Sequence, residues 1–218
     1  MNKGFIIEIE GADGVGKTTF CNNMKELFEK DNNKVKIVKF PSEDNYIGKY
    51  IRETLLSKEM LCPLNIFQNL YFLEQLSKKS QLEELVNDGY IVLLDRYETS
   101  TLIFSLAYEK VYGVNMSIKE LINLQRLLLK PDVKILLTAP KNVIKQRIIN
   151  SNKKDFHESN VELQNVITDE YMNLATTNYI SDNWNIISTE SPIKIQYNAL
   201  SCIIGMNRLF NKEKFKFI

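Results

Sequence analysis

The segment "GADGVGKT" at 11–18 constrains the fold of this chain more than any other feature of the sequence. It follows an apolar run at 5–10 and opens a segment with apolar residues at helical spacing, which is the setting that a phosphate-binding loop requires. Glycines there let backbone N–H groups turn inward around phosphate oxygens, and the helix N-terminus adds partial positive charge. Lys17 can reach the outer phosphates and Thr18 can ligate Mg²⁺. The motif therefore predicts that a nucleoside triphosphate is bound at a strand-to-helix turn.

Short apolar runs rich in β-branched residues have the length of strands, and segments with helical spacing separate them. The predicted strands are 5–10, 35–40, 90–95, 133–138 and 184–188. Strands that alternate with helices favour right-handed crossovers, a parallel sheet and helices on both of its faces. We therefore expect an α/β fold of the P-loop NTPase type with five parallel strands, as a single domain over 1–218. Ligands of such sheets bind beyond the carboxyl ends of the strands.

The composition shows no sign of a nucleic-acid-binding or membrane protein. The formal net charge is +1, and no apolar run reaches the roughly 18 residues that a membrane helix needs. Three cysteines (Cys21, Cys62 and Cys202) lie far apart without metal-ligand spacing, which favours a reducing compartment over a disulfide framework. We expect a cytoplasmic protein that binds neither nucleic acid nor membrane.

A GTP-dependent switch is one alternative, because "NKKD" at 152–155 matches the Asn-Lys-x-Asp pattern that reads guanine. That reader should end a buried strand, whereas the residues before it have helical spacing. The glycine expected three residues after the strand-terminal Asp95 is also replaced, by Glu98. These two departures favour an enzyme over a switch.

The sequence "LLDRYETS" at the end of the third predicted strand adds a second phosphate-binding element. Asp95 there can hold the Mg²⁺ shell, while Arg96 can point at a second phosphate. With the phosphate loop, this sequence resembles the thymidylate kinase family. The resemblance covers most of the chain and includes "FPSEDNYIG" at 40–48, Ser100 after "DRY", "KPD" at 130–132 and a polar lid segment near 151–158.

The resemblance implies transfer of the γ-phosphoryl group of ATP to dTMP, with Mg²⁺ as the cofactor. In this family Asp13 would hold the acceptor sugar hydroxyl, Arg96 the acceptor phosphate and Phe104 the deoxyribose side, while Arg147 would lie against adenine. The implied catalytic residues are Lys17, Asp13, Asp95, Arg96, Lys153 and Lys154, and the implied metal ligands are Thr18 and Asp95. The ATP-binding set is Gly11, Ala12, Asp13, Gly14, Val15, Gly16, Lys17, Thr18, Thr19 and Arg147. The acceptor-binding set is Asp13, Phe40, Pro41, Phe67, Gln68, Tyr71, Gln75, Arg96, Ser100 and Phe104.

The lid is the expected source of a further positive charge. Some members of the family carry an arginine in the phosphate loop and others in the lid, and the loop here has none. Lys153 and Lys154 are therefore the candidates to contact the transferring phosphoryl group, and a solvated charged loop is the alternative. Phosphoryl transfer needs alignment and charge neutralisation rather than a histidine base. The polar surroundings of His157 predict an exposed lid residue.

The position after Phe40-Pro41 departs from the family pattern. The family usually has an arginine two residues on that meets the acceptor phosphate, but this chain has Glu43, and a carboxylate repels a phosphate. Either Glu43 turns away and Arg96 carries the phosphate, alone or with Lys49 or Arg52, or the acceptor is bound differently.

The long helix predicted over 64–87 departs from the pattern as well. Family members place an aromatic residue that stacks on thymine four positions before an arginine that reads its carbonyl, and this helix has no arginine. Gln68 or Gln75 could replace it, because an amide both donates and accepts hydrogen bonds. The aromatic residues Phe67 and Phe72 fit a buried face as well as a base-stacking role. Another deoxynucleotide, such as dUMP or a modified pyrimidine nucleotide, is the alternative acceptor. Family members also pair through helices, so we expect a homodimer.

Overall fold

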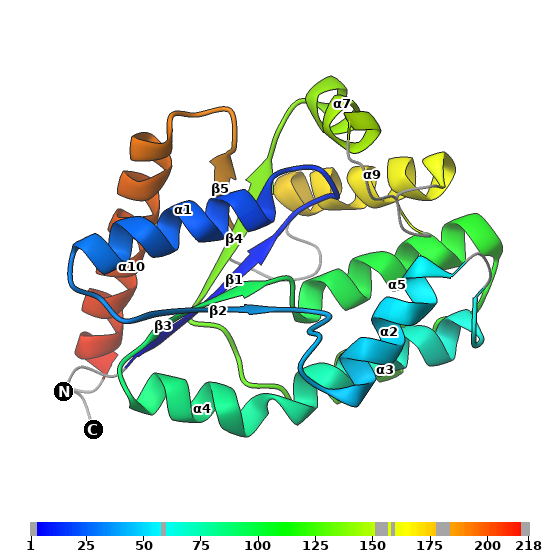
Figure 1. Cartoon of the computed structure of the whole chain (residues 1–218), viewed down its shortest axis with the longest axis horizontal. Coiled ribbons are helices and arrows are strands. Elements are labelled where there is room, and N and C mark those ends of the chain that lie inside the picture. Colours follow the sequence, from blue (N-terminus) through cyan, green and yellow to red (C-terminus); the bar gives the residue numbers. More distant parts are fainter. Residues whose placement is uncertain (1–3, 58–59, 151–156, 158–159, 178–183, 215–218) are drawn as a thin grey trace.

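The predicted parallel sheet is confirmed by a computed structural model of the chain, which describes residues 4–57, 60–150, 157, 160–177 and 184–214. The strand order is β2-β3-β1-β4-β5, and all paired strands run parallel (Figure 1). The strands are β1 (Phe5–Glu10), β2 (Val35–Lys39), β3 (Ile91–Asp95), β4 (Val133–Thr138) and β5 (Trp184–Ser188). Each lies within a residue of its predicted range, because short buried runs of β-branched residues leave few alternatives to a central strand.

The described helices connect and cover these strands. They are α1 (Lys17–Lys30), α2 (Tyr46–Leu56), α3 (Leu64–Ser77), α4 (Lys79–Asn87), α5 (Glu98–Tyr112), α6 (Ile118–Gln125), α7 (Lys141–Asn150), α9 (Val161–Thr177) and α10 (Ile193–Lys214). Several ends carry the expected signals: the Asn45 side chain accepts from Gly48 N at 2.8 Å to cap α2, and Gly113 ends α5 at φ 66°. No described helix is both long enough and apolar enough to cross a membrane.

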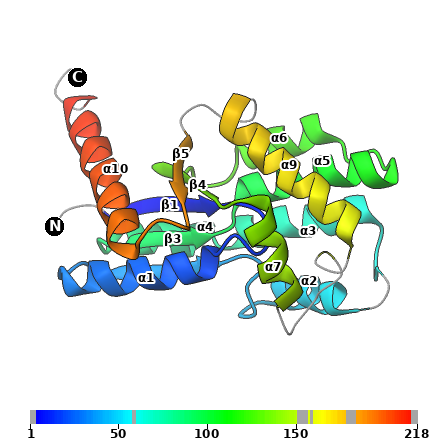
Figure 2. The same cartoon turned by 90° about the horizontal axis from the view of Figure 1, so that it is seen from above.

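Side chains at alternating positions of β1 pack into two core clusters on opposite faces of the sheet. Ile7 and Ile9 of β1 belong to the cluster that includes Met24 of α1, and α10 packs beside α1. Ile6 belongs to the second cluster, with Leu82 of α4. Helices therefore cover both faces, as predicted. Figure 2 shows α1 along one face of the sheet, with α10 crossing the side away from α2 and α3.

The helix predicted over 64–87 is two helices, so that prediction was wrong. The chain breaks at Lys78, whose backbone N–H bonds to Gln75 O at 3.2 Å in a tightened turn. The Lys78 side chain is buried and pairs with Asp44, which holds the break in place. Because of the bend, Leu82 and Val86 of α4 pack in the second cluster against the sheet, whereas α3 lies beyond the carboxyl edge of the sheet. A helical pattern that changes the face it buries can still look continuous in sequence.

Candidate active site

A cavity of about 830 Å³ lies beyond the carboxyl ends of β1, β2 and β3, where the topology predicts a ligand. Its walls come from the phosphate loop and the start of α1, residues 39–41, and the facing sides of α3 and α5. Arg147 of α7 and residues 189–196 close the end beside the phosphate loop. Figure 1 shows α2, α3 and α5 together on the side of the sheet toward which β2 points.

The phosphate loop has the geometry that its glycines predict. Gly16, directly before α1, has φ 107°, and a Cβ on Gly11 would lie 2.7 Å from Leu137 O. Lys17 Nζ donates to Gly11 O and Ala12 O, each at 2.9 Å. Burial, followed by the nearby Arg96 charge, lowers the pKa of Lys17 to about 8. The lysine is therefore held over the loop, at the cavity wall.

Arg96 joins the end of β3 to the phosphate loop. Its Nη2 forms an ion pair with Asp13 Oδ1, and Nη1 donates to Ser100 Oγ at 3.0 Å. Burial tends to raise the pKa of Asp13, but the Arg96 and Lys17 charges outweigh it and lower the pKa to about 2. Asp13 Oδ2 accepts from Gln164 Nε2 at 2.9 Å, so a sugar hydroxyl at Asp13 would share an oxygen already in use. The predicted residues Asp13, Arg96, Lys17 and Ser100 are thus brought together around one cavity.

The backbone of Arg96 is left-handed, with φ 70°. Non-glycine residues pay for this conformation, which persists only where the surroundings fix it. Here Arg96 N donates to Ile9 O at 3.1 Å, and the next N–H, of Tyr97, donates to Glu10 Oε1 at 2.8 Å. Ser100 Oγ and Tyr171 OH donate to the other oxygen of Glu10, at 2.7 and 2.8 Å. Buried Glu10 therefore positions the turn that aims Arg96.

Glu8 and Glu10 were not identified as site residues from the sequence. Their only signal is two acidic residues inside an otherwise apolar strand. Glu8 is fully buried; burial, opposed by Lys134 at 3.5 Å, raises its pKa to about 8. Glu8 Oε1 accepts from Thr99 N and Glu10 Oε1 from Ser100 N, each at 3.0 Å, so both side chains hold the first turn of α5.

Thr18 and Asp95 meet as the predicted metal ligands should. Thr18 Oγ1 donates to Asp95 Oδ2 at 2.8 Å, and both residues line the cavity beside Lys17. A hydroxyl and a carboxylate are oxygen donors that suit Mg²⁺, which usually keeps several waters and phosphate oxygens besides one or two protein ligands. Among the described residues no group of three or more His, Cys, Asp or Glu could hold a metal ion.

Arg147 lies at the end of the cavity where the ATP base is expected. Its Nη1 donates to Val15 O at 2.9 Å and to Thr189 Oγ1 at 3.2 Å, and Nη2 pairs with Glu190 at 2.7 Å. Thr189 and Gln196 line the same end and were missed from the sequence. They follow β5 and carry no motif, so only the sheet topology could have identified them.

The acceptor-binding residues divide between the cavity wall and the core. Most of the predicted set lines the cavity: Asp13, Phe40, Pro41, Gln68, Tyr71, Gln75, Arg96, Ser100 and Phe104. Phe67 is fully buried in the first core cluster, edge-on to the Tyr71 ring at a centroid distance of 5.4 Å, and is not a wall residue. Phe72 belongs to the second cluster. The core interpretation therefore fits both phenylalanines, and Tyr71 is the aromatic residue of α3 on the wall.

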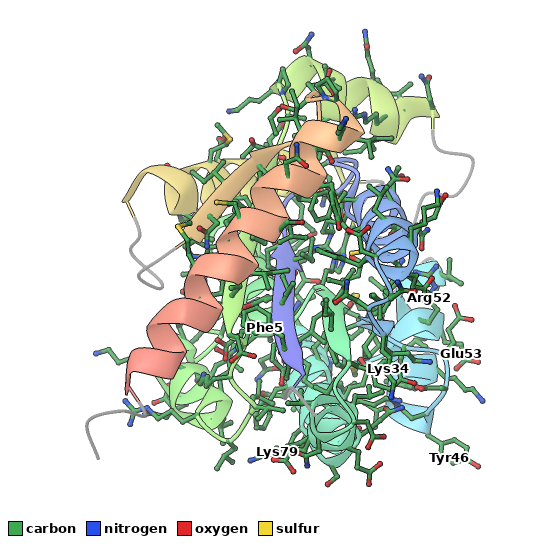
Figure 3. All side chains as sticks on the ribbon, turned by 90° about the vertical axis from the view of Figure 1, so that its left-hand side faces the viewer. Phe5, Lys34, Tyr46, Arg52, Glu53 and Lys79 are labelled. Carbon is green, nitrogen blue, oxygen red and sulfur yellow. The ribbon has the colours of Figure 1, made fainter. Side chains whose placement is uncertain are left out.

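Glu43 turns away from the cavity, as one of the two alternatives expected. Its side chain is 72% exposed and pairs with Arg52 at 3.5 Å. Arg52, on α2 (Figure 3), lines the cavity, and so does Lys39 at the end of β2. Lys49 lies over the Tyr46 ring at 6.0 Å instead. Besides Lys17 and Arg147 beside the phosphate loop, the described Lys and Arg residues on the cavity wall are thus Arg96, Arg52 and Lys39.

His157 is buried, so the prediction of an exposed lid residue was wrong. Its ring lies 4.9 Å from Phe104 and 6.2 Å from Phe67 by centroids, and Nε2 contacts Tyr108 OH. Polar sequence neighbours predicted exposure, but the aromatic residues that surround His157 come from α3 and α5, which sequence proximity cannot indicate. Lys153 and Lys154 lie outside the described residues, as does most of the predicted lid.

Comparisons with known proteins agree with this geometry. The family model described as thymidylate kinase matches residues 9–199. A probable thymidylate kinase of Caldivirga maquilingensis is 26% identical over 170 residues, which cover 78% of this chain and 80% of that protein. A probable thymidylate kinase of Pyrococcus horikoshii is 29% identical over 178 residues, covering 79% and 83%. The solved structure of thymidylate kinase from Candida albicans superposes with a TM-score of 0.79 at 25% identity, covering 94% of this chain and 93% of that one.

Proposed function

The chain belongs to the thymidylate kinase family and is an ATP-dependent nucleoside monophosphate kinase that phosphorylates dTMP, and we propose that the cavity beyond β1, β2 and β3 is where transfer occurs. One observation carries this assignment: the Asp13–Arg96 ion pair joins the phosphate loop, which suits ATP, to the end of β3, which suits a second phosphate. Donor and acceptor sites therefore share one cavity. Such alignment is most of what phosphoryl transfer asks of a protein.

On the donor side, we propose that ATP lies along the phosphate loop with its base beside Arg147. Lys17 then leaves the carbonyls of Gly11 and Ala12 and turns its ammonium to the outer phosphates. The loop N–H groups and the start of α1 contribute further positive potential. Thr18 and Asp95 would hold Mg²⁺, which when bound neutralises charge on the β- and γ-phosphate oxygens.

On the acceptor side, we propose that Arg96 binds the phosphate of dTMP with help from Arg52. An oxygen of that phosphate attacks the γ-phosphorus; the new P–O bond forms as the bond to the bridging oxygen breaks, and ADP leaves. Arg52 is held by Glu43 in a half-exposed pair of little strength, so a phosphate can draw it away at small cost. Phe104 packs against the deoxyribose, and its ring lies 5.3 Å from the Arg96 guanidinium.

Three further elements of the proposal concern the lid, the assembly and the compartment. Lys153 or Lys154 supplies positive charge to the transferring group. Two copies pair through α3, which exposes Ile66 and Leu73, each at close to half of its surface. The protein acts in the cytoplasm, which accords with its three free cysteines. Sedimentation of the pure protein tests the pairing, with a monomer at micromolar concentration as the contrary result.

A coupled assay of ADP release against a panel of nucleoside monophosphates tests the function. With ATP and Mg²⁺, dTMP should stimulate ADP release and yield dTDP in equal amount. ADP release that no monophosphate stimulates would refute the kinase assignment. A purine monophosphate as the best acceptor would refute the proposed acceptor site instead.

A further inference from the structure

The amide of Gln68 is buried at the cavity wall without a hydrogen-bond partner. The residue is 2% exposed, and neither Nε2 nor Oε1 is bonded to any group in the described part of the chain. Leaving a buried amide unpaired costs about 1–3 kcal/mol for each polar group. Among buried side-chain polar atoms that lack a partner in this part, those on cavity-lining residues belong to Gln68 and Gln75 alone. The unpaired atoms of these two glutamines therefore lie where a ligand would bind.

The two glutamines differ in what they can offer a ligand. Gln75 Nε2 donates to Thr101 Oγ1 at 3.1 Å, so Oε1 is the atom of the Gln75 amide without a described partner. Gln68 presents a donor and an acceptor side by side, and nothing described fixes which atom points where. An amide of this kind can form two hydrogen bonds at once with the edge of a base.

Gln68 also lies at the depth where a base is expected. Gln75 bonds to Thr101, which follows Ser100, the residue that accepts a hydrogen bond from Arg96. Gln75 therefore lies at the end of the cavity where Arg96 is. Phe67 precedes Gln68 on α3. Phe67 lies at the same depth in the cavity region as Phe104 of α5, because the His157 ring is close to both phenylalanine rings. Gln68 is seven residues before Gln75, about 10 Å farther along α3. A nucleotide whose phosphate is at Arg96 and whose sugar is at Phe104 directs its base toward Gln68.

We propose that Gln68 reads the pyrimidine at N3 and C4, and that it accepts amino and oxo pyrimidines alike; this rests on the acceptor site proposed above. In one orientation Oε1 accepts from N3–H and Nε2 donates to O4 of thymine or uracil. Turned by half a revolution, Oε1 accepts from the 4-amino group and Nε2 donates to N3 of cytosine. The substrate class is therefore the pyrimidine deoxynucleoside monophosphates, dCMP included.

The first test compares dUMP with dCMP, which differ only at this edge. Because one amide serves both, their kcat/KM values should agree within about tenfold. The Gln68→Arg variant offers donors only, so it should favour dUMP over dCMP by at least about tenfold more than the wild type does. A wild-type enzyme that excludes dCMP by several hundredfold would overturn the proposal without touching the kinase assignment, which the dTMP reaction tests separately.

The second test removes the hydrogen bonds from the ligand side. The nucleotide with 2,4-difluorotoluene in place of thymine keeps the shape of dTMP without its polar edge. Wild-type enzyme should use it about 10- to 100-fold less well than dTMP, and Gln68→Met should reduce that ratio to within about threefold. Gln81→Met, on the exposed face of α4, is the matched control and should keep the wild-type ratio.

Folding of the variants is checked by melting temperature, which Gln68→Met should not lower because it removes an unpaired buried amide, and by ATP affinity, which should match the wild type. If Gln68→Met does not fold, the wild-type comparison of dTMP with the difluorotoluene nucleotide still tests whether the polar edge of the base is read. Equal use of these two nucleotides by the wild type would show that no side chain reads the base edge. A ratio unchanged in folded Gln68→Met would show that another residue does.

Discussion

Replacing Lys17 by methionine keeps the length of the side chain and removes its charge, which isolates the contribution of the ammonium to ATP binding. About 4 Å from a phosphate oxygen, at an effective dielectric near 20, the ammonium contributes roughly 4 kcal/mol. To reach it, Lys17 gives up its two bonds to Gly11 O and Ala12 O. At about 1 kcal/mol each, they offset half of that gain. The remaining 2 kcal/mol or so corresponds to a roughly 30-fold loss of ATP affinity.

The assay has two parts. Calorimetry with MgATP gives the dissociation constant, and coupled ADP release gives kcat/KM with dTMP and with dUMP. Lys17→Met should raise the dissociation constant for MgATP about 30-fold and lower kcat/KM by about 30-fold or more with either acceptor, while dTMP affinity stays unchanged. Lys25→Met, eight residues along α1 at an exposed ion pair with Glu29 at 3.7 Å, should behave like the wild type. ATP affinity within twofold of wild type in Lys17→Met would refute the reasoning.

Three other outcomes follow from the buried charges. Arg96→Ala should raise the KM for dTMP. It should also lower the free energy of unfolding, measured by urea titration, by about 3–5 kcal/mol, because it leaves Asp13 buried without its ion-pair partner. Unchanged stability would contradict the pairing. Glu8→Gln should stabilise the protein more at pH 8 than at pH 5. The pKa of Glu8 is raised from 4.5 to about 8, so the wild type loses stability as pH rises from 4.5 to 8, whereas the glutamine stays neutral. Melting curves of both proteins at pH 5 and pH 8 test this, and an equal effect at the two pH values would contradict it. The kcat/KM for ATP should fall as pH rises through about 8, where free Lys17 loses its proton, and a flat pH profile to pH 10 would count against its role.

Much of the fold could be predicted because its signals are local. The buried strands are short apolar runs, and the loop at 11–18 sits between the first of them and an amphipathic helix. The break at Lys78 could not be predicted in the same way. It depends on which face each half of the segment buries, and Leu82 packs under the sheet only because α4 turns there. Periodicity shows that a face is buried but not what covers it.

The site residues show the same difference between local sequence signals and contacts that depend on the fold. Lys17, Thr18, Asp95 and Arg96 sit in motifs whose spacing carries their chemistry, and the structure brings them to one cavity. His157 was misjudged because its partners come from elements far away in the sequence. Glu8 and Glu10 were missed for a related reason. Their role in bonding the first turn of α5 can be seen only when α5 is known to begin beside β1.

A crystal structure with a bisubstrate analogue, in which five phosphates join adenosine to thymidine, tests the shared cavity most directly when Mg²⁺ is present. We expect the polyphosphate between Lys17 and Arg96, the adenine beside Arg147 and the thymine edge against Gln68. Electron density that placed the two nucleosides in separate surface sites, or that left Lys17 bonded to Gly11 O and Ala12 O with the analogue bound, would contradict it.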